Sequence, residues 1–128
     1  MSRNRGHGGQ ATVELVLLLP VVVLALLLVI QVGLIARTQV LVVNAAREGA
    51  RAAAIDGTGA ARAAAARSPG IDDGRLTVVA ETEPGETRDL VRVEVRYRAR
   101  TDVPLAGALV AEPELRAEVV MLAEDPGG

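Results

Sequence analysis

An apolar run near the N-terminus is the strongest pattern in the chain. No charged residue occurs between Leu15 and Ala36, and only Pro20 and Gln31 interrupt the apolar side chains. This run of about 22 residues matches the roughly 20 that a helix needs to cross the hydrocarbon core of a bilayer. A helix that is apolar on every side must be enclosed, and the rest of this chain is too small to enclose it. We therefore predict a transmembrane helix over 10–36.

The helix is expected to continue beyond the apolar run, over 37–56. This segment contains no Pro and is rich in Ala and Arg, which favour helix. Small residues recur along it, and two interpretations have equal weight: they let a neighbouring helix approach closely, or they pack on this protein's own domain. Pro20 removes a backbone donor near the start of the span, and the Gln31 amide needs a neighbouring helix or the headgroups to satisfy it. The residues expected in helix packing are Pro20, Gln31, Ala46, Gly49, Ala50 and Ala53.

The remaining residues, 57–128, are expected to form a small α/β domain. The sequence Asp56-Gly57-Thr58-Gly59 breaks the helix, and a short Ala-rich helix follows from about Ala60 to Arg67. Apolar residues then recur with a period of two, which is typical of strands with one buried face. Three such segments occur: Leu76 to Ala80, Val91 to Ala99 and Leu115 to Met121.

The connections between these strands are also visible in the sequence. Asp72-Asp73-Gly74 indicates a solvated turn, and Glu83-Pro84-Gly85-Glu86 indicates another. Pro104 to Val110 is expected to form a short helix or a loop, and the tail from Glu124 to Gly128 to fray. The predicted fold class is α+β: a long N-terminal helix packed on an antiparallel sheet of about three strands, in a pilin-like arrangement.

Composition narrows the function classes. Half of the 128 residues are hydrophobic, yet there is no Phe, no Trp and one Tyr, which fits a membrane segment better than a soluble core. The chain has no Cys, and His7 is its only His. With a net charge of -2, no global charge steers nucleic acid or anionic membranes to the protein. We expect no catalytic residue, no metal site and no cofactor.

A row of arginines on the second strand invites a nucleic-acid interpretation. Arg92, Arg96, Arg98 and Arg100 lie there without interleaved aromatic residues that could stack on bases. Three acids are expected to complement the arginines across the strands, namely Glu81, Glu94 and Glu118. The sequence therefore favours a solvated sheet face and no nucleic-acid partner.

The charges that flank the apolar run predict its orientation. Arg3 and Arg5 precede the run within a Gly-rich leader, residues 1–9, and no acid occurs before Glu14. Arg37, Arg47 and Arg51 follow the run, so the positive-inside rule alone gives only a small bias. The short leader and its free N-terminal amine favour a cytoplasmic leader, with 37–128 outside. An ordinary cleaved signal fits less well, because its apolar region is only about 7–15 residues long. Cleavage of that kind would leave a secreted chain that starts near Arg37.

A short motif lies at the start of the apolar run. Gly9 is followed, after four residues, by Glu14, and this spacing before a lone apolar helix resembles the processing site of type IV prepilins and pseudopilins. Cleavage after Gly9 would free the amine of Gln10 one helical turn from Glu14, and a carboxylate there costs several kcal/mol unless it is paired. Gly9 would offer the protease an extended backbone. The alternative is an interfacial Glu14 whose side chain reaches the headgroups.

The surrounding residues narrow this resemblance to one branch. The stretch GQATVELVLLLPVVVLALLLVIQVGL, followed by NAAREGARAA, is similar to the TadE-like pattern over about the first 54 residues. Leu15 stands where the family commonly has an aromatic residue, and Gln31 where a second acid is often found.

The resemblance implies a function. TadE-like proteins are structural minor pilins or pseudopilins of the tight-adherence system that help to assemble Flp pili for adhesion, and are not enzymes. The implied partners are the prepilin peptidase, other pilins, the membrane assembly platform and lipid. The alternative is an uncleaved, signal-anchored binding or accessory subunit outside the cell membrane.

Overall fold

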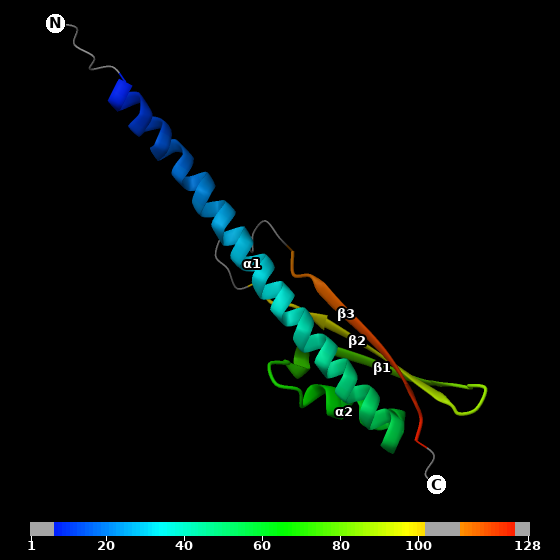
Figure 1. Cartoon of the computed structure of the whole chain (residues 1–128). Helices are drawn as coiled ribbons and strands as arrows, with labels where there is room; N and C mark the ends of the chain where they lie inside the picture. Colours follow the sequence, from blue (N-terminus) through cyan, green and yellow to red (C-terminus); the bar gives the residue numbers. More distant parts are fainter. Residues whose placement is uncertain (1–6, 102–110, 125–128) are drawn as a thin grey trace, which may run out of the picture. The chain divides into compact units, whose positions relative to one another are not determined.

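The computed structural model describes residues 7–101 and 111–124 (Figure 1). Most of the basic leader, the segment from Pro104 to Val110 and the residues from Asp125 onward therefore lie outside the described residues. The described residues fall into two compact units. The first holds residues 7–33 with Thr101 and Ala111, and the second holds 34–100 and 112–124.

One helix, α1 (His7–Asp56), contains both the apolar run and its predicted continuation. It passes through Pro20 without interruption. It ends before Gly57, whose φ of 89° lies in the left-handed region that glycine adopts without strain. The Gly57 N–H still donates to the Ala53 carbonyl at 3.0 Å, which satisfies one of the last carbonyls of the helix.

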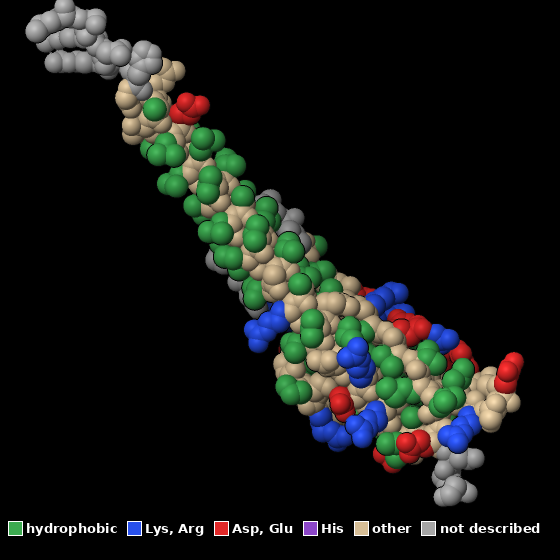
Figure 2. Space-filling view, in the orientation of Figure 1, with side chains coloured by type: hydrophobic (Ala, Val, Ile, Leu, Met, Phe, Trp, Pro, Cys, Tyr) green, Lys and Arg blue, Asp and Glu red, His purple; other side chains and the backbone are tan. Residues whose placement is uncertain are grey.

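In the first unit, α1 presents a largely exposed apolar surface. Figure 2 shows hydrophobic side chains along the visible face of this part of the helix. Leu15, Leu17 and Val29 have exposed fractions of 67%, 70% and 68%. The described residues of this unit therefore do not bury the apolar run as a soluble core would.

The second unit adds a short helix and a sheet to the C-terminal half of α1. A 3-10 turn, η1 (Thr58–Ala60), leads into α2 (Ala61–Ala66), close to the short Ala-rich helix that the sequence predicts. A second 3-10 turn, η2 (Asp73–Arg75), precedes the sheet and replaces the expected simple turn at Asp72-Asp73-Gly74.

The sheet has three antiparallel strands in the order β1-β2-β3. They are β1 (Leu76–Glu83), β2 (Leu90–Arg98) and β3 (Glu114–Leu122), which confirms the three predicted strands and the α+β class. In register, Val95 lies between Val78 and Ala117, and Val93 lies between Ala80 and Val119. These residues share one face of the sheet, and the charged residues of β2 share the other.

The core lies between the C-terminal half of α1, α2 and the apolar face of the sheet. Its helix side consists mainly of alanines, and its sheet side of valines with one Tyr. Gly49 allows a close approach of α1 to α2 and β2, because a Cβ built there would lie 3.1 Å from the Ala61 carbonyl oxygen and 3.4 Å from Cγ1 of Val93. The buried residues are Val42, Ala45, Ala46, Ala50, Ala53, Ala61, Ala65, Leu76, Val91, Val93, Val95, Tyr97 and Ala117.

Two hydrogen bonds fix how β3 runs along α1. The Gln39 side-chain amide donates from Nε2 to the Arg116 carbonyl at 3.0 Å, and the Glu124 N–H donates to the Ala54 carbonyl at 2.8 Å. The strand therefore runs in the same direction as the helix beside it.

Candidate functional site

The predicted processing residues lie in the first turns of α1. Gly9, Gln10 and Glu14 are all exposed. A Cβ built on Gly8 or Gly9 would meet no other atom within 4 Å, so space around the backbone is open. The backbone at Gly9 is nevertheless helical and not extended as the sequence suggested. A protease that binds an extended backbone must therefore unwind this first turn. The first N–H groups of a helix have no intrahelical hydrogen bonds, so unwinding this turn breaks few of them.

Glu14 lies one turn beyond Gln10, on the same side of the helix. It is the only acidic residue before Glu48 in the sequence. Its neighbours Val13 and Leu15 are apolar and have exposed fractions of 60% and 67%. Within the described part of the chain, Glu14 makes no ion pair. Its carboxylate is therefore available to an incoming cationic group.

The apolar part of α1 suits a lipid environment. Within 7–101 and 111–124, α1 is the one helix long and apolar enough to cross a membrane. Large hydrophobic side chains are exposed along it from Val13 to Leu34. A soluble monomer rarely exposes so continuous an apolar surface. The helix is consistent with single-pass membrane anchoring.

The two residues that interrupt the apolar run have different surroundings. Pro20 is exposed. The Gln31 side chain is only 1% exposed, and neither its Nε2 nor its Oε1 atom has a hydrogen-bonding partner among the described residues. A buried amide without a partner costs roughly 1–3 kcal/mol. Gln31 is thus the polar group of the helix that most needs a partner.

The small residues of α1 lie inside the second unit. Ala46 and Ala50 are fully buried, Ala53 is 2% exposed and Gly49 is buried. Their nearest neighbours include α2 and β2, as the contacts at Gly49 show. Of the two interpretations that the sequence left open, the structure thus shows the packing of this stripe on the protein's own domain. These residues do not adjoin Gly9, Gln10 and Glu14 in one site.

Charges on the outer face of the sheet pair with one another. Arg92 donates to Glu83 at 2.8 and 3.2 Å and also bonds Glu118, and Arg96 bonds Glu94. The hydrogen bond from Arg92 lowers the pKa of Glu83, and the one from Arg96 lowers the pKa of Glu94. The Arg92 pKa is raised by its hydrogen bond to Glu83 and by the charge of Glu118.

Two members of this set differ from the prediction: Glu94 pairs with Arg96 on its own strand, and Glu81 makes no ion pair among the described residues. Glu81 lies directly opposite Arg92 in register, yet the guanidinium bonds Glu83 on the diagonal and Glu118 on the other strand. A long arginine side chain can reach diagonal neighbours, and here two carboxylates hold it. Two of the four arginines of the row, Arg92 and Arg96, are thus paired with carboxylates, which weakens any nucleic-acid interpretation.

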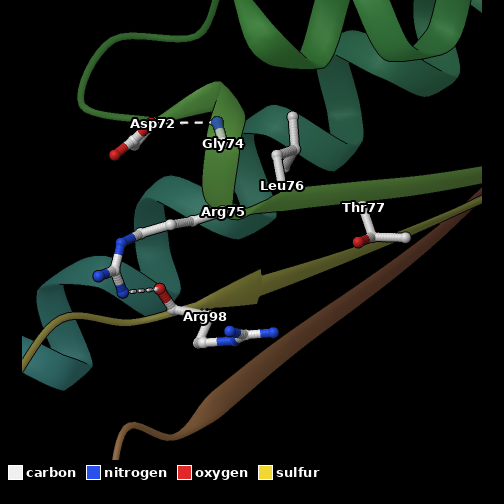
Figure 3. Close-up of a pocket in the computed structure, with 6 residues that line it drawn as sticks. All are labelled: Asp72, Gly74, Arg75, Leu76, Thr77 and Arg98. Atoms are coloured by element: carbon white, nitrogen blue, oxygen red, sulfur yellow. Dashed lines mark hydrogen bonds between the residues drawn. The ribbon is translucent and has the colours of Figure 1, made fainter.

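A polar hollow of about 410 Å³ lies at one end of the sheet. It is lined by Asp72, Gly74, Arg75, Leu76, Thr77 and Arg98 (Figure 3). Asp72 accepts the Gly74 N–H at 3.1 Å, and its own N–H donates to the Tyr97 hydroxyl at 3.3 Å. Arg75 donates to the Arg98 carbonyl at 3.2 Å and to the Glu112 carboxylate at 3.3 Å.

Sequence reasoning did not find this hollow. Arg75 and Arg98 are far apart in the sequence, and only the pairing of β1 with β2 brings them together. No group of three or more potential metal-ligating side chains occurs in the part of the chain that the structure describes.

Comparison with known proteins gives one match. The family model described as TadE-like protein matches residues 9–51. This segment begins at Gly9, contains Glu14 and the whole apolar run, and ends within the small-residue stripe. No curated protein and no solved structure was found to match the chain. The match covers the N-terminal third of the chain, and over this segment the protein is TadE-like.

Proposed function

We propose that this protein is a minor pilin or pseudopilin of the tight-adherence system, which the prepilin peptidase cuts after Gly9. The match of residues 9–51 to TadE-like proteins supports a role in the biogenesis of Tad (Flp) pili. The observation that carries the proposal is the coincidence of three features: the family match begins at Gly9, Glu14 is exposed and unpaired within the described residues, and one apolar helix follows.

The proposed cleavage changes the charge at the start of the helix. Hydrolysis of the peptide bond between Gly9 and Gln10 leaves a carboxylate on Gly9 and a protonated amine on Gln10. This amine lies one turn from Glu14 on the same side of α1. An ion pair between them, within one chain or between neighbours, removes most of the cost of a carboxylate at the membrane boundary. Glu14 would also lie in the first turns of the shortened helix, where the macrodipole favours an acid.

The proposed topology follows from the same helix. Residues 1–9 are a cytoplasmic leader, 10–36 cross the membrane, 37–56 continue as helix outside it, and 57–128 form the extracytoplasmic domain. Arg3 and Arg5 before the span support this orientation. The proposed role is structural, in a pilus that serves adhesion. The proposed partners are the peptidase, other pilins and the membrane assembly platform.

A second candidate is an uncleaved, signal-anchored accessory subunit. It is favoured by one observation, the regular helix through Gly9 and Gln10, because a helical backbone is a poor protease substrate until it unwinds. This candidate keeps the same anchor and the same outer domain. It differs in having an intact leader.

The N-terminus of the membrane-bound protein distinguishes the two candidates. Mass spectrometry of the chain purified with and without the prepilin peptidase should show a peptidase-dependent start at Gln10. Gly9→Val should block the cleavage, and Gly8→Val should not, because both glycines have open space and differ only in their distance from the scissile bond. An intact leader in the presence of the peptidase would establish the accessory subunit instead.

A further inference from the structure

We propose that the hollow lined by Arg75, Thr77 and Arg98 binds the phosphate of an anionic phospholipid headgroup. The inference rests on one part of the proposed function, the anchoring of α1 in a membrane, and not on cleavage at Gly9. Three observations carry it: the level of the hollow along the helix, the state of its two guanidinium groups, and its size.

The level of the hollow follows from hydrogen bonds within the second unit. Gln39 contacts Arg116, and Ala54 contacts Glu124, so eight strand residues run beside fifteen helix residues. These correspond to about 26 Å of strand and about 22 Å of helix, so the two segments have similar lengths and run side by side.

The same spacing can be followed toward the membrane. Two strand residues before Arg116 stands Glu114, which is paired in register with Arg98. That step of about 7 Å along the strand corresponds to four to five residues of helix. Counted back from Gln39, which lies beside Arg116, it places Arg98 at the level of Leu34 and Ile35 along α1. The apolar run ends at Ala36. Arg98 and the hollow beside it therefore lie where lipid headgroups meet a membrane-spanning α1.

The two guanidinium groups of the hollow differ in their partners. Arg75 is held by the Arg98 carbonyl and by Glu112 at 3.3 Å, so its position is fixed. Arg98 is exposed and makes no ion pair among the described residues, although Arg92, Arg96 and Arg116 on the same face all do. Figure 3 shows its guanidinium on the same side of the sheet as the Thr77 hydroxyl.

The one carboxylate that lines the hollow does not block an anion. Asp72 already accepts the Gly74 N–H at 3.1 Å, and Figure 3 shows its carboxylate turned away from Arg98. A guanidinium such as that of Arg98 can bind a phosphate through two parallel hydrogen bonds, and a hydroxyl such as that of Thr77 can donate a third. A volume of about 410 Å³ accommodates a phosphate with its glycerol.

The test uses the full-length, uncleaved protein in phosphatidylcholine nanodiscs, into which phosphatidylglycerol is titrated. Native mass spectrometry counts the phosphatidylglycerol retained by the released protein. Arg98→Gln should weaken retention about fivefold, the factor that corresponds to about 1 kcal/mol for one arginine at a membrane surface. Arg88→Gln is the matched control, because Arg88 is also exposed but lies in the turn between β1 and β2, at the other end of the hairpin. Its retention should equal that of the unchanged protein.

Each other outcome is decisive. Equal retention by the Arg98→Gln and Arg88→Gln proteins would overturn the headgroup site and leave the anchor intact. Displacement of the lipid by inorganic phosphate at matched concentration would show a site for a soluble anion and would overturn the lipid assignment. A chain that fails to enter nanodiscs would overturn the anchoring and the inference with it, whereas a chain that enters them without cleavage leaves the processing proposal to its own test.

Discussion

Val93→Ala tests whether the sheet and the C-terminal half of α1 form one core. Val93 is fully buried at the centre of β2, between Ala80 and Val119 in register. The substitution deletes two methyl groups, which lose about 1.6 kcal/mol of transfer free energy at about 0.8 kcal/mol each. The cavity that remains adds to this loss, because the surrounding backbone collapses only in part. We expect a total destabilisation of about 2–3 kcal/mol.

The expected change in melting temperature is large for a unit of this size. In a domain of 60–100 residues, 1 kcal/mol shifts the melting temperature by about 4–8 °C, so the loss should lower it by about 10–20 °C. Tyr97 is a specific reporter, because it is the only aromatic residue of the chain and is 5% exposed in this core. Its fluorescence in detergent therefore follows unfolding of the second unit without a signal from the apolar helix.

Val79→Ala is the matched control. Val79 lies on the neighbouring strand but on the outer face, with 42% of its surface exposed. Its truncation should cost less than about 1 kcal/mol. Equal melting temperatures for the two variants would refute the assignment of the core to the α1 side of the sheet.

Two further predictions concern the small-residue stripe and the charged face. Gly49→Leu should destabilise the isolated protein by about 1–2 kcal/mol, because overpacking of the core outweighs the gain in helix propensity. If the stripe served only contacts between copies of the protein, the melting curve of the monomer, followed by tyrosine fluorescence, would not change. The depressed pKa values of Glu83 and Glu94 contribute stability that is present above the ordinary glutamate pKa of 4.5 and lost as the pH falls through the lowered values. The melting temperature of the E83Q/E94Q protein should therefore fall less on acidification than that of the unchanged protein, and Glu86→Gln in the exposed turn should not flatten this pH dependence.

Periodicity predicted the fold because it reports one-sided burial directly. Alternate residues of β2 are buried from Val91 to Tyr97, and this pattern is the one that the sequence displays. The apolar run predicted the first half of α1 for the same reason, since its length and composition are local properties. The break at Gly57 is also local, because it requires a positive φ.

Features that depend on long-range pairing could not be predicted. The choice of Glu83 over Glu81 by Arg92 depends on the reach of a side chain across a registered sheet. The hollow at Arg75 and Arg98 requires the hairpin to close first. The helical backbone at Gly9 arises because no Pro interrupts α1 between His7 and Leu19, although two glycines lower the helix propensity there.

The burial of the small-residue stripe limits how a TadE-like chain of this kind can join an assembly. The stripe is occupied by α2 and β2, and most of the charged groups on the outer sheet face are paired with one another. An extended exposed surface that remains among the described residues is the apolar part of α1. Lipid tails are as apolar as leucine, so exchange of lipid for neighbouring helices gains little hydrophobic free energy. The exposed charged group of this segment, the Glu14 carboxylate, therefore accounts for most of the difference in free energy between the lipid-embedded and the helix-packed states, whereas the Gln31 side chain is already buried. In the proposed function, the amine freed at Gln10 gives Glu14 a partner, and this makes processing a precondition for leaving the membrane.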